Sequence, residues 1–469
     1  MKIAPAFSPA RLAAVVPLVA VLLATGCVAE DPPDPAEEPE GSGEPAEAER
    51  EAYVPATRFD TSAAVTLQRE GSKEGRIAPV ALHEGTVYFT DSTTLHAHDA
   101  FEDKELWSFK TEHPPRHTDR VTHSASLVET ENGPVVIGAI ETQASAEGTA
   151  EEKPHLEVIA VDAESGDRLW HTVHESESGL RLAPYALGAD GEHILVRYDG
   201  VRALDAKTGK AVWNNPDIRP YALQGGAVVG DTGEVPSELR AVSADTGEEL
   251  WTVQDYDEHR TEAAGTSGQP SEGFLLPPAS ADPTRSAALY PAGSGRVAFV
   301  AGEVRDWTAM DIQIKGGLEP EVEYGTLLLI DAETGAVEHT VDTTPEADRP
   351  QDRHQWGDSD CAYDGKDTLV CWENTEEEMV GTRAVAAVDT DSGEVRWVEE
   401  FGEERPMIDV TGVGQGALYA EVSGEPVTLS LEDGSDLATE AGAAPDLTNG
   451  FIAVTYGEDG ALTVHPVVG

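Results

Sequence analysis

The sequence has little positive charge and very few cysteines. It contains 31 lysine and arginine residues against 88 aspartate and glutamate residues, which gives a formal net charge of −57. A surface of this sign repels phosphate backbones, which argues against a nucleic acid as the partner. Three cysteines in 469 residues are too few for a disulfide scaffold. Aromatic residues make up 6% of the chain, but the hydrophobic share of 39% is enough for a packed core.

Long hydrophobic runs are also lacking, except for one near the N-terminus. Lys2 and Arg11 precede an apolar stretch from Leu12 to Leu23, which is shorter than the roughly 20 residues needed to cross a bilayer. This arrangement is typical of an export signal. The stretch ends in Leu-Ala-Thr-Gly-Cys27, which resembles a bacterial lipobox with alanine in place of the usual leucine. We therefore expect residues 1–27 to be a lipoprotein signal peptide with Cys27 as the lipid attachment residue. The alternative is a secretory signal with an incidental cysteine.

An acidic segment rich in proline and glutamate follows. Residues 28–56 contain ten acidic residues, one arginine and six prolines, with almost nothing to bury. Such a segment is predicted to be a disordered linker that its own charge keeps extended. Most of the negative charge still belongs to residues 57–469. Adaptation to a salty medium and cation binding both explain this acidity, and the sequence leaves the choice open.

A repeated unit occupies residues 57–469. An apolar strand leads into Asp-x-x-Thr/Ser-Gly, and a second strand leaves this turn and ends on tryptophan. Short polar side chains bond to the turn backbone and glycine supplies a positive φ, so each unit is predicted to be a β-hairpin. The tryptophan recurs at one place in the unit, which predicts packing against a neighbouring unit. The structural repeat residues are Asp162, Gly166, Trp170, Asp205, Gly209, Trp213, Gly247, Trp251, Asp331, Gly335, Asp389, Gly393 and Trp397.

Eight further β-prone runs accompany the turns, from Thr86–Phe89 to Phe451–Val454. Regular copies of such a unit in one chain predict an all-β propeller in which each repeat forms a four-stranded blade. The last repeat lacks a fourth strand, and Ala64–Gln68 could supply it and close the ring, leaving no exposed sheet edge at the junction. We predict eight blades, with seven as the alternative.

The Asp-x-x-Thr-Gly-x-x-x-Trp unit resembles the repeat of the PQQ-like (quinoprotein-type) β-propellers over most of residues 60–469. Some members of this family are quinone-dependent dehydrogenases. Others, similar to the outer-membrane assembly lipoprotein BamB, carry no cofactor and bind proteins. For the enzymes, the resemblance implies a vicinal cysteine pair, a tryptophan floor under the quinone, calcium ligands and a catalytic aspartate. No vicinal cysteine pair occurs in the sequence, so we predict no catalytic residue, no metal site and no cofactor.

The spacing between repeats is uneven. Gly247 and Gly335 are more than twice as far apart in sequence as Gly209 and Gly247. The excess lies in Asp255–Pro291 and Arg305–Tyr324, which are predicted to be long loops on one rim that carry recognition. A degenerate ninth blade is the alternative.

Two cysteines and two polar clusters remain as candidate sites. Cys361 and Cys371 flank a predicted hairpin, and after export they are expected to form a structural disulfide. Four nearby aspartates suggest calcium, but their spacing departs from a calcium-binding loop. Histidines near the first repeat suggest zinc, but without a metal-ligand spacing. We therefore attribute the aspartate cluster to chance in so acidic a chain and the histidine cluster to an exposed loop and strand face. The clusters consist of Asp358, Asp360, Asp364 and Asp367, and of His96, His98, His113, His117 and His123.

These features together predict a non-catalytic lipoprotein on the extracytoplasmic face of the cell membrane. Its propeller would bind an unknown protein or another cell-envelope component through rim loops and the central funnel. Two alternatives stay open: a PQQ- or metal-dependent dehydrogenase, and a ligand-sensing propeller module.

Overall fold

A computed structural model describes most of the chain downstream of residue 49. The described residues are 50–67, 79–116, 123–144, 153–176, 184–232, 238–253, 289–301, 326–342, 359–374, 382–402, 405–457 and 461–469. They form strands and turns without helices, so none of them belongs to a helix that could cross a membrane.

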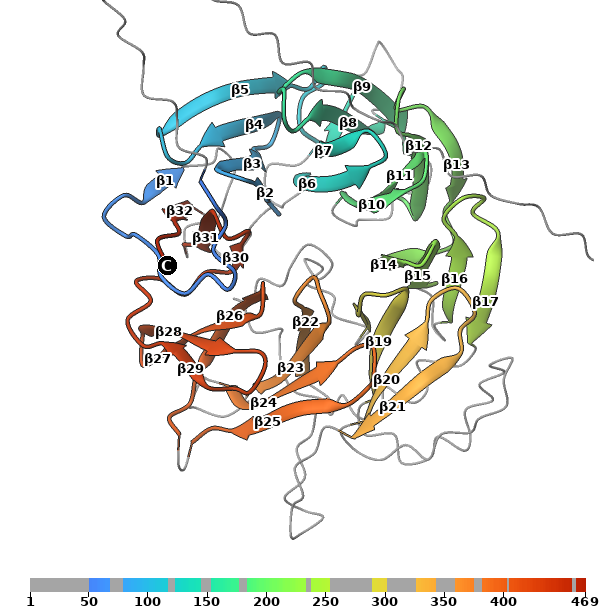
Figure 1. Ribbon diagram of the computed structural model, residues 1–469. Helices are drawn as coiled ribbons and strands as arrows, with labels where there is room; N and C mark the ends of the chain where they lie inside the picture. The colour runs from blue at the N-terminus through green and yellow to red at the C-terminus, as the bar shows by residue number, and fades with distance from the viewer. Residues whose placement is uncertain are drawn as a thin grey trace, which may run out of the picture. The chain divides into compact units, whose positions relative to one another are not determined.

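Within the described residues, eight antiparallel sheets of four strands each are arranged as blades around a central axis (Figure 1). The first strand of each blade lies nearest the axis and the fourth lies at the outer edge. Blade 1 contains β2 (Ala81–His83), β3 (Thr86–Thr90), β4 (Thr94–Asp99) and β5 (Lys104–Lys110), and blade 2 contains β6 (His123–Thr130), β7 (Gly133–Gln143), β8 (Pro154–Asp162) and β9 (Arg168–Glu175). Blade 3 contains β10 (Tyr185–Asp190), β11 (His193–Arg197), β12 (Val201–Asp205) and β13 (Ala211–Asn215), and blade 4 contains β14 (Arg219–Gln224), β15 (Ala227–Asp231), β16 (Leu239–Ser243) and β17 (Glu249–Val253).

The second half of the ring repeats the same order until the last blade. Blade 5 contains β18 (Leu289–Pro291), β19 (Arg296–Ala301), β20 (Thr326–Asp331) and β21 (Val337–Asp342), and blade 6 contains β22 (Ser359–Tyr363), β23 (Thr368–Asn374), β24 (Thr382–Asp389) and β25 (Val395–Glu400). Blade 7 contains β26 (Asp409–Gly414), β27 (Ala417–Val422), β28 (Glu425–Ser430) and β29 (Asp436–Ala438), and blade 8 contains β30 (Leu447–Thr448), β31 (Ile452–Tyr456), β32 (Leu462–Pro466) and β1 (Val65–Leu67).

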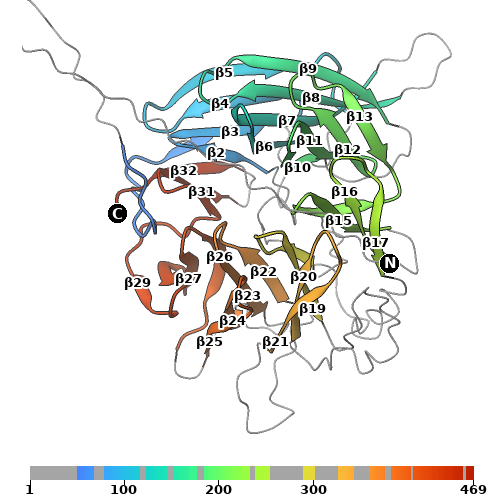
Figure 2. The same cartoon turned by 45° about the vertical axis from the view of Figure 1, so that its right-hand side comes forward.

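Strand β1 completes the eighth blade. It pairs antiparallel with β32, placing Val65 opposite Val464 and Leu67 opposite Leu462. A cluster of buried side chains then joins blade 8 to blade 1, and these two blades are neighbours in Figure 2. The predictions of an all-β propeller with eight blades and of closure by the N-terminal strand are confirmed, and the seven-blade alternative is wrong.

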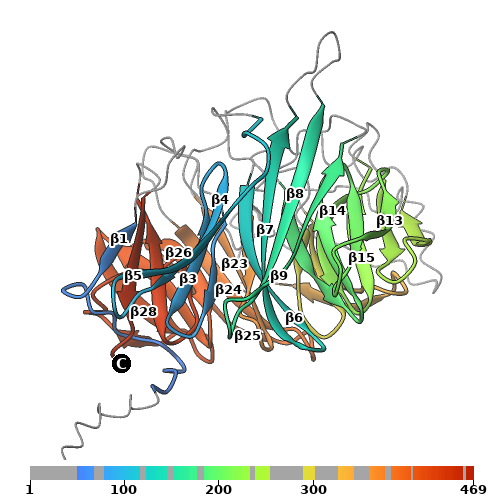
Figure 3. The same cartoon turned by 90° about the horizontal axis from the view of Figure 1, so that it is seen from above.

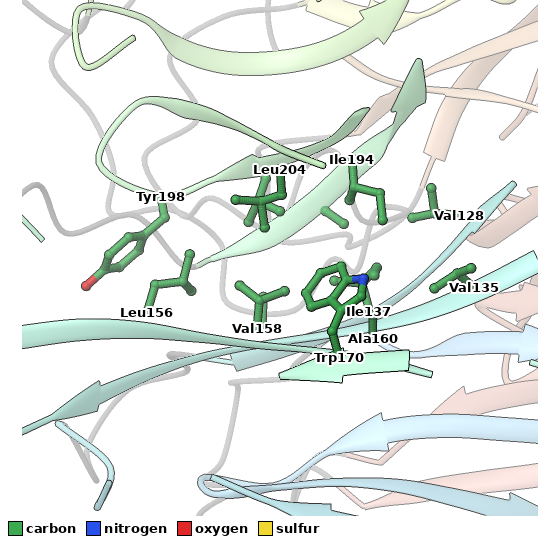
Figure 4. Packing of buried hydrophobic residues seen from close by; sticks show 13 residues of the cluster. Val128, Val135, Ile137, Leu156, Val158, Ala160, Trp170, Ile194, Tyr198 and Leu204 are labelled. Carbon is green, nitrogen blue, oxygen red and sulfur yellow. The ribbon is translucent and has the colours of Figure 1, made fainter. Parts of the chain in front are cut away.

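The hydrophobic core is divided among the junctions between blades. Each pair of neighbouring blades shares one cluster of buried apolar side chains. Between blades 2 and 3 the cluster contains Val158 and Trp170 of one blade and Ile194 and Leu204 of the other (Figure 4). Because a blade is covered on both sides, its middle strands consist of nearly continuous apolar residues. The fold therefore depends on packing between blades.

The outer-strand tryptophans make the most regular contact between blades. In four junctions the indole N–H donates a hydrogen bond to a backbone carbonyl in the turn between the third and fourth strands of the next blade. The pairs are Trp170 Nε1 with Ala206 O (2.8 Å), Trp213 Nε1 with Ala244 O (3.2 Å), Trp251 Nε1 with Ala332 O (2.9 Å) and Trp397 Nε1 with Leu431 O (2.9 Å). At these four junctions the indole contributes both apolar contact and a directed hydrogen bond to the next blade.

The aspartate, threonine and glycine of the repeat form the turn on which this tryptophan packs. Asp205 Oδ1 accepts hydrogen bonds from Thr208 N at 2.8 Å and from Thr208 Oγ1 at 2.6 Å. Gly209 has a φ of +67°, and a Cβ at this position would lie 2.4 Å from Cε3 of Trp170. Glycine is needed here both for its backbone conformation and for the room that it leaves.

The junction of blades 4 and 5 excludes a hidden ninth blade. Trp251 of blade 4 bonds directly to Ala332 of blade 5, and the ring of Trp251 packs on Gly335. No space is left between these two blades for another sheet, so the alternative of a ninth blade is wrong.

Two different faces result from the order of the strands. Turns from first to second strand and from third to fourth strand share one end of the axis, which we call the turn face. Connections from second to third strand and from blade to blade share the other end, which we call the loop face. In Figure 3, β7 and β8 extend far toward the loop face, while the C-terminus lies at the turn face.

Both termini of the propeller meet at the turn face of blade 8. Thr57 N and Arg58 N donate hydrogen bonds to Gly469 O at 2.7 and 2.9 Å. Upstream, Tyr53 N donates to Gly450 O at 3.0 Å. These bonds hold β1 in place from its N-terminal side.

Part of the predicted linker is packed on the propeller. Ala56 is fully buried, and its carbonyl accepts a hydrogen bond from Tyr419 Oη at 3.1 Å. The structured part of the chain thus reaches back to Arg50, whereas the prediction placed the end of the linker at residue 56. Residues 1–27 and 28–49 lie outside the described residues.

We predict that Gly209→Ala lowers the free energy of unfolding by about 2–4 kcal/mol, because the methyl group adds overpacking against Trp170 to the backbone strain. Gly191→Ala in the same blade is the matched control, because Gly191 has a φ of +55° but nothing within 4 Å of its Cβ position. It should cost only about 1–2 kcal/mol of strain. Urea unfolding of both variants measures the difference, and equal costs would contradict the proposed role of the tryptophan contact.

Candidate binding face

The loop face carries the longer connections of the propeller. Strand β17 ends at Val253 and β18 begins at Leu289, while β19 ends at Ala301 and β20 begins at Thr326, all at this face. The two predicted recognition loops, Asp255–Pro291 and Arg305–Tyr324, therefore leave and return at one rim. Their residues lie outside the described residues, apart from the last three of the first loop, which form β18 instead.

Blade 2 anchors the connection that reaches it from blade 1. Glu157 on β8 is completely buried and accepts hydrogen bonds from the backbone N–H groups of Glu112 (2.7 Å) and His113 (2.9 Å). Thr142 Oγ1 donates to the same carboxylate at 2.9 Å. His171 Nε2 lies 2.9 Å from it, as does Nδ1 of His113. One carboxylate thus holds together three segments of the chain.

The charge of Glu157 follows from this environment. Burial raises the pKa of a carboxyl group, but here the hydrogen bonds from His171, from the backbone of Glu112 and His113 and from Thr142 outweigh it. They lower the pKa of Glu157 to about 2. The group is therefore ionised at neutral pH, and its charge fixes the position of the connection.

A second ion pair continues this attachment. Arg116 Nη1 contacts the nearly buried carboxylate of Glu141, and Pro115 forms a β-bridge with Thr142. Gln143 N donates to Pro114 O at 3.0 Å. The connection consequently follows the end of β7 as an added strand-like segment.

Blades 3 and 4 hold buried charges at the same face. In blade 3 the guanidinium of Arg197 lies 4.9 Å from the ring centroid of Tyr185, and Ser176 Oγ donates to Asp199. Arg197 and Asp199 are almost completely buried. A buried charge that loses its partner costs free energy. We therefore expect these contacts to hold the ends of the loops in one position.

In blade 4 a buried carboxylate is held from two sides. Arg219 forms a bidentate pair with Asp231, with Nε to Oδ1 at 2.9 Å and Nη2 to Oδ2 at 2.7 Å. Tyr221 Oη donates to Oδ2 of Asp231 at 2.8 Å. Because Arg219 and Asp231 stand at the ends of β14 and β15, the pair clamps the loop-face end of the blade.

The loop face between blades 7 and 8 is acidic. Asp409 and Glu421 stand directly opposite each other on β26 and β27. Burial raises the pKa of Asp446 to about 7, with a further contribution from Glu421, although the N–H of Tyr456 bonds to Asp446 at 3.0 Å. The charge of the face therefore differs from blade to blade.

The predicted repeat residues all lie away from this face. The Asp-x-x-Thr/Ser-Gly turns belong to the turn face, and the tryptophans dock onto them between blades. Cys361 and Cys371 stand opposite each other on β22 and β23 and are joined by a disulfide that lies in the cluster between blades 5 and 6. Cys27 lies outside the described residues.

The structure gives the candidate calcium ligands other roles. Asp364 Oδ1 accepts hydrogen bonds from the backbone N–H groups of Lys366, Asp367 and Thr368 in a turn. Asp367 pairs with Arg396 at 2.9 Å. Asp360 is buried at the start of β22, and Asp358 lies outside the described residues.

The candidate zinc ligands are likewise spread over several local contacts. His96 lies 3.2 Å from oxygens of Asp91 and of Glu105, and His98 lies 3.1 Å from Asp103. His123 is buried, contrary to the expected exposed position, and its Nδ1 lies 2.9 Å from Thr90 Oγ1. His117 is outside the described residues. Among the residues that the structure describes, no group of three or more His, Cys, Asp or Glu side chains is arranged to hold a metal ion.

Sequence reasoning missed the buried charges of the loop face. The available signal was a single charge inside an apolar strand, as with Glu157 in Leu-Glu-Val-Ile and Arg197 after Ile-Leu-Val. In a chain with 88 acidic residues this signal is hard to separate from solvent-exposed positions.

The comparison with known families agrees with this architecture. Residues 57–216 match the family model described as outer membrane protein assembly factor BamB. The matched stretch holds the closing strand and the first three blades, and it supports the PQQ-like β-propeller family that the repeat suggested. No curated protein sequence matches the chain.

Solved structures with a similar arrangement come from distant proteins. BamB from Moraxella catarrhalis is 14% identical, with a TM-score of 0.44 over 86% of this chain and 98% of that chain. Sqt1 from Saccharomyces cerevisiae is 11% identical, with a TM-score of 0.47 over 86% and 98%. The C-terminal WD40 domain of Sif2 is 8% identical, with a TM-score of 0.46 over 86% and 99%.

We predict that Glu157→Gln destabilises the protein by about 2–4 kcal/mol at pH 7, because the amide cannot replace an ionised acceptor among so many donors. The folded-state pKa of about 2 lies below the usual 4.5, so the carboxylate stabilises the fold fully above pH 4.5 and loses this effect as the pH falls toward 2. The difference in Tm between wild type and variant should therefore shrink over that range. Glu175→Gln, at an exposed position on β9, is the control, and a difference in Tm that does not change with pH would contradict the assignment.

Proposed function

We propose that this protein is a non-catalytic lipoprotein on the extracytoplasmic face of the cell membrane, whose propeller binds a protein or another envelope component through its loop face. The observation that carries this proposal is the structural difference between the two faces. The repeat turns of the turn face are occupied by packing between blades, whereas the connections of the loop face vary in length and charge. Such variable connections on a rigid support are where recognition is usually found.

The position of residues 50–56 indicates the face of the propeller at which a lipid tether would arrive. Arg50 places its guanidinium 3.6 Å from the ring centroid of Phe101 in a turn of blade 1, and Tyr53 bonds to Gly450 in a turn of blade 8. The chain thus enters the propeller at the turn face. A lipid on Cys27 would therefore tether the propeller by way of its turn face, which leaves the loop face free for a partner.

The enzyme alternatives lack a supporting feature among the described residues. A quinone-dependent dehydrogenase of this family would need calcium ligands, and the aspartates that suggested calcium are used in a turn and in an ion pair. A ligand-sensing module would need a small molecule that binds the propeller. The connections of the loop face come from several blades, which favours a larger partner that can contact many of them at once.

The lipid anchor can be tested with Cys27→Ala in the full chain. We expect the variant to lose incorporation of labelled palmitate and to move from the membrane fraction to the soluble fraction, because the acyl chains are the only proposed attachment. Thr25→Ser keeps the cysteine and serves as the matched control. Retention of the label in Cys27→Ala would contradict the anchor.

The use of the loop face can be tested by photo-crosslinking in intact cells. A benzophenone side chain at Glu112, whose side chain is 67% exposed, reports on the loop face, and one at Asp245, which is 78% exposed, reports on the turn face. We expect discrete adducts from position 112 and none from position 245. Adducts from position 245 alone, or from neither position, would contradict the proposal.

A further inference from the structure

The junction of blades 1 and 2 departs from the docking pattern of the other tryptophans. Ala163 has the same turn position as Ala206 and Ala244, but its carbonyl accepts a hydrogen bond from Tyr88 Oη at 3.0 Å. Trp107, the outer-strand tryptophan of blade 1, instead places Nε1 over Gly166, 2.7 Å from the position of a Cβ. Within the described part of the chain this indole nitrogen makes no hydrogen bond. The hydroxyl of Tyr88 has taken the acceptor that a docked tryptophan would use.

A pocket of about 440 Å³ lies at this altered junction, on the turn face. Tyr88, Trp107 and Leu106 supply its aromatic and apolar lining, with the two rings 5.8 Å apart between centroids. Leu106 is 46% exposed. Glu84 and Glu164 also line the pocket and are exposed to solvent. The pocket therefore combines aromatic surface with two carboxylates and the imidazole of His83.

These carboxylates are available for a partner. Neither Glu84 nor Glu164 forms an ion pair with a described residue, in contrast to Glu192, which lies 3.1 Å from Lys207 in the corresponding part of blade 3. An indole ring beside carboxylates attracts organic cations through the charge of the carboxylates and the negative face of the ring. The high negative charge of the chain adds to this attraction.

The protein itself already places guanidinium groups on aromatic rings next to the pocket. Arg168 lies 5.5 Å from the ring centroid of Phe109, whose ring is 5.0 Å from that of Trp107. Arg50 lies 3.6 Å from the ring centroid of Phe101 in the adjacent turn. A planar guanidinium can stack on an indole while donating hydrogen bonds to two carboxylates, which an ammonium group cannot do in the same way.

We propose that this pocket binds the guanidinium group of an arginine side chain presented by a partner protein. The site lies on the turn face and does not depend on the function proposed for the loop face. A single side chain at a partly exposed site binds weakly, so the contribution of the pocket would add to contacts elsewhere on the partner.

The probe for a direct test is N-acetylarginine amide, added to the purified full-length protein. The readout is the indole N–H resonance of Trp107, identified by its absence in Trp107→Phe. We expect a saturable shift of this resonance. In Glu84→Gln/Glu164→Gln the affinity should fall about fourfold or more, because each exposed ion pair contributes about two- to fivefold in affinity.

Glu333→Gln is the matched control, because Glu333 has the same turn position as Glu164 at a junction where the tryptophan is docked. It should leave the affinity unchanged, and none of these surface variants should alter the Tm. The lysine and tetramethylammonium analogues should bind more weakly than the arginine probe. Absence of a saturable shift, an unchanged affinity in the double variant, or tighter binding of tetramethylammonium would each overturn the proposal.

Discussion

Packing between neighbouring blades is the interaction on which the eight-bladed propeller depends, and at four junctions a tryptophan covers a glycine of the next blade and bonds to its turn. A four-stranded blade taken alone would expose apolar side chains on both sides, so its stability comes from its neighbours. The indole of Trp170 makes two contacts with the next blade: its ring covers Gly209, which buries apolar surface, and its N–H donates a hydrogen bond to Ala206 O, which fixes the orientation of the ring. Repeated at successive junctions, this contact sets how each blade meets the next.

The same contact explains why the two ends of the axis differ. The turns that receive the rings keep a short, regular form, so the turn face is nearly uniform. The opposite ends of the strands are free of this constraint, and there the chain uses buried charges such as Glu157 and Asp231 to hold individual connections. At the junction of Trp107, whose indole N–H bonds to no carbonyl of the described residues, a pocket lies on the turn face.

The fold could be predicted because its information is local. Asp205, Thr208, Gly209 and Trp213 fall within one short segment, and their spacing in each copy predicts the turn without knowledge of distant residues. The candidate binding face could not be predicted in the same way. Glu157 acquires its role from Glu112, His113 and His171, which are 14 to 45 residues away in sequence and lie beside it only in the folded protein.

The sequence by itself predicted the repeat, the hairpin in each unit and a closing strand within Ala64–Gln68, because each depends on a pattern shorter than one repeat. A count of the repeats favoured eight blades over seven, and the structure decided between them. Tertiary structure alone decided how those patterns are used at particular junctions. Tyr88 and Ala163 are 75 residues apart, and Tyr88 bonds to the carbonyl that corresponds to the one a tryptophan uses at four other junctions, while Trp107 still packs on Gly166. A repeat determines the features that neighbouring blades share, whereas a contact between residues far apart in sequence, such as that of Tyr88 with Ala163, makes one junction differ from the others.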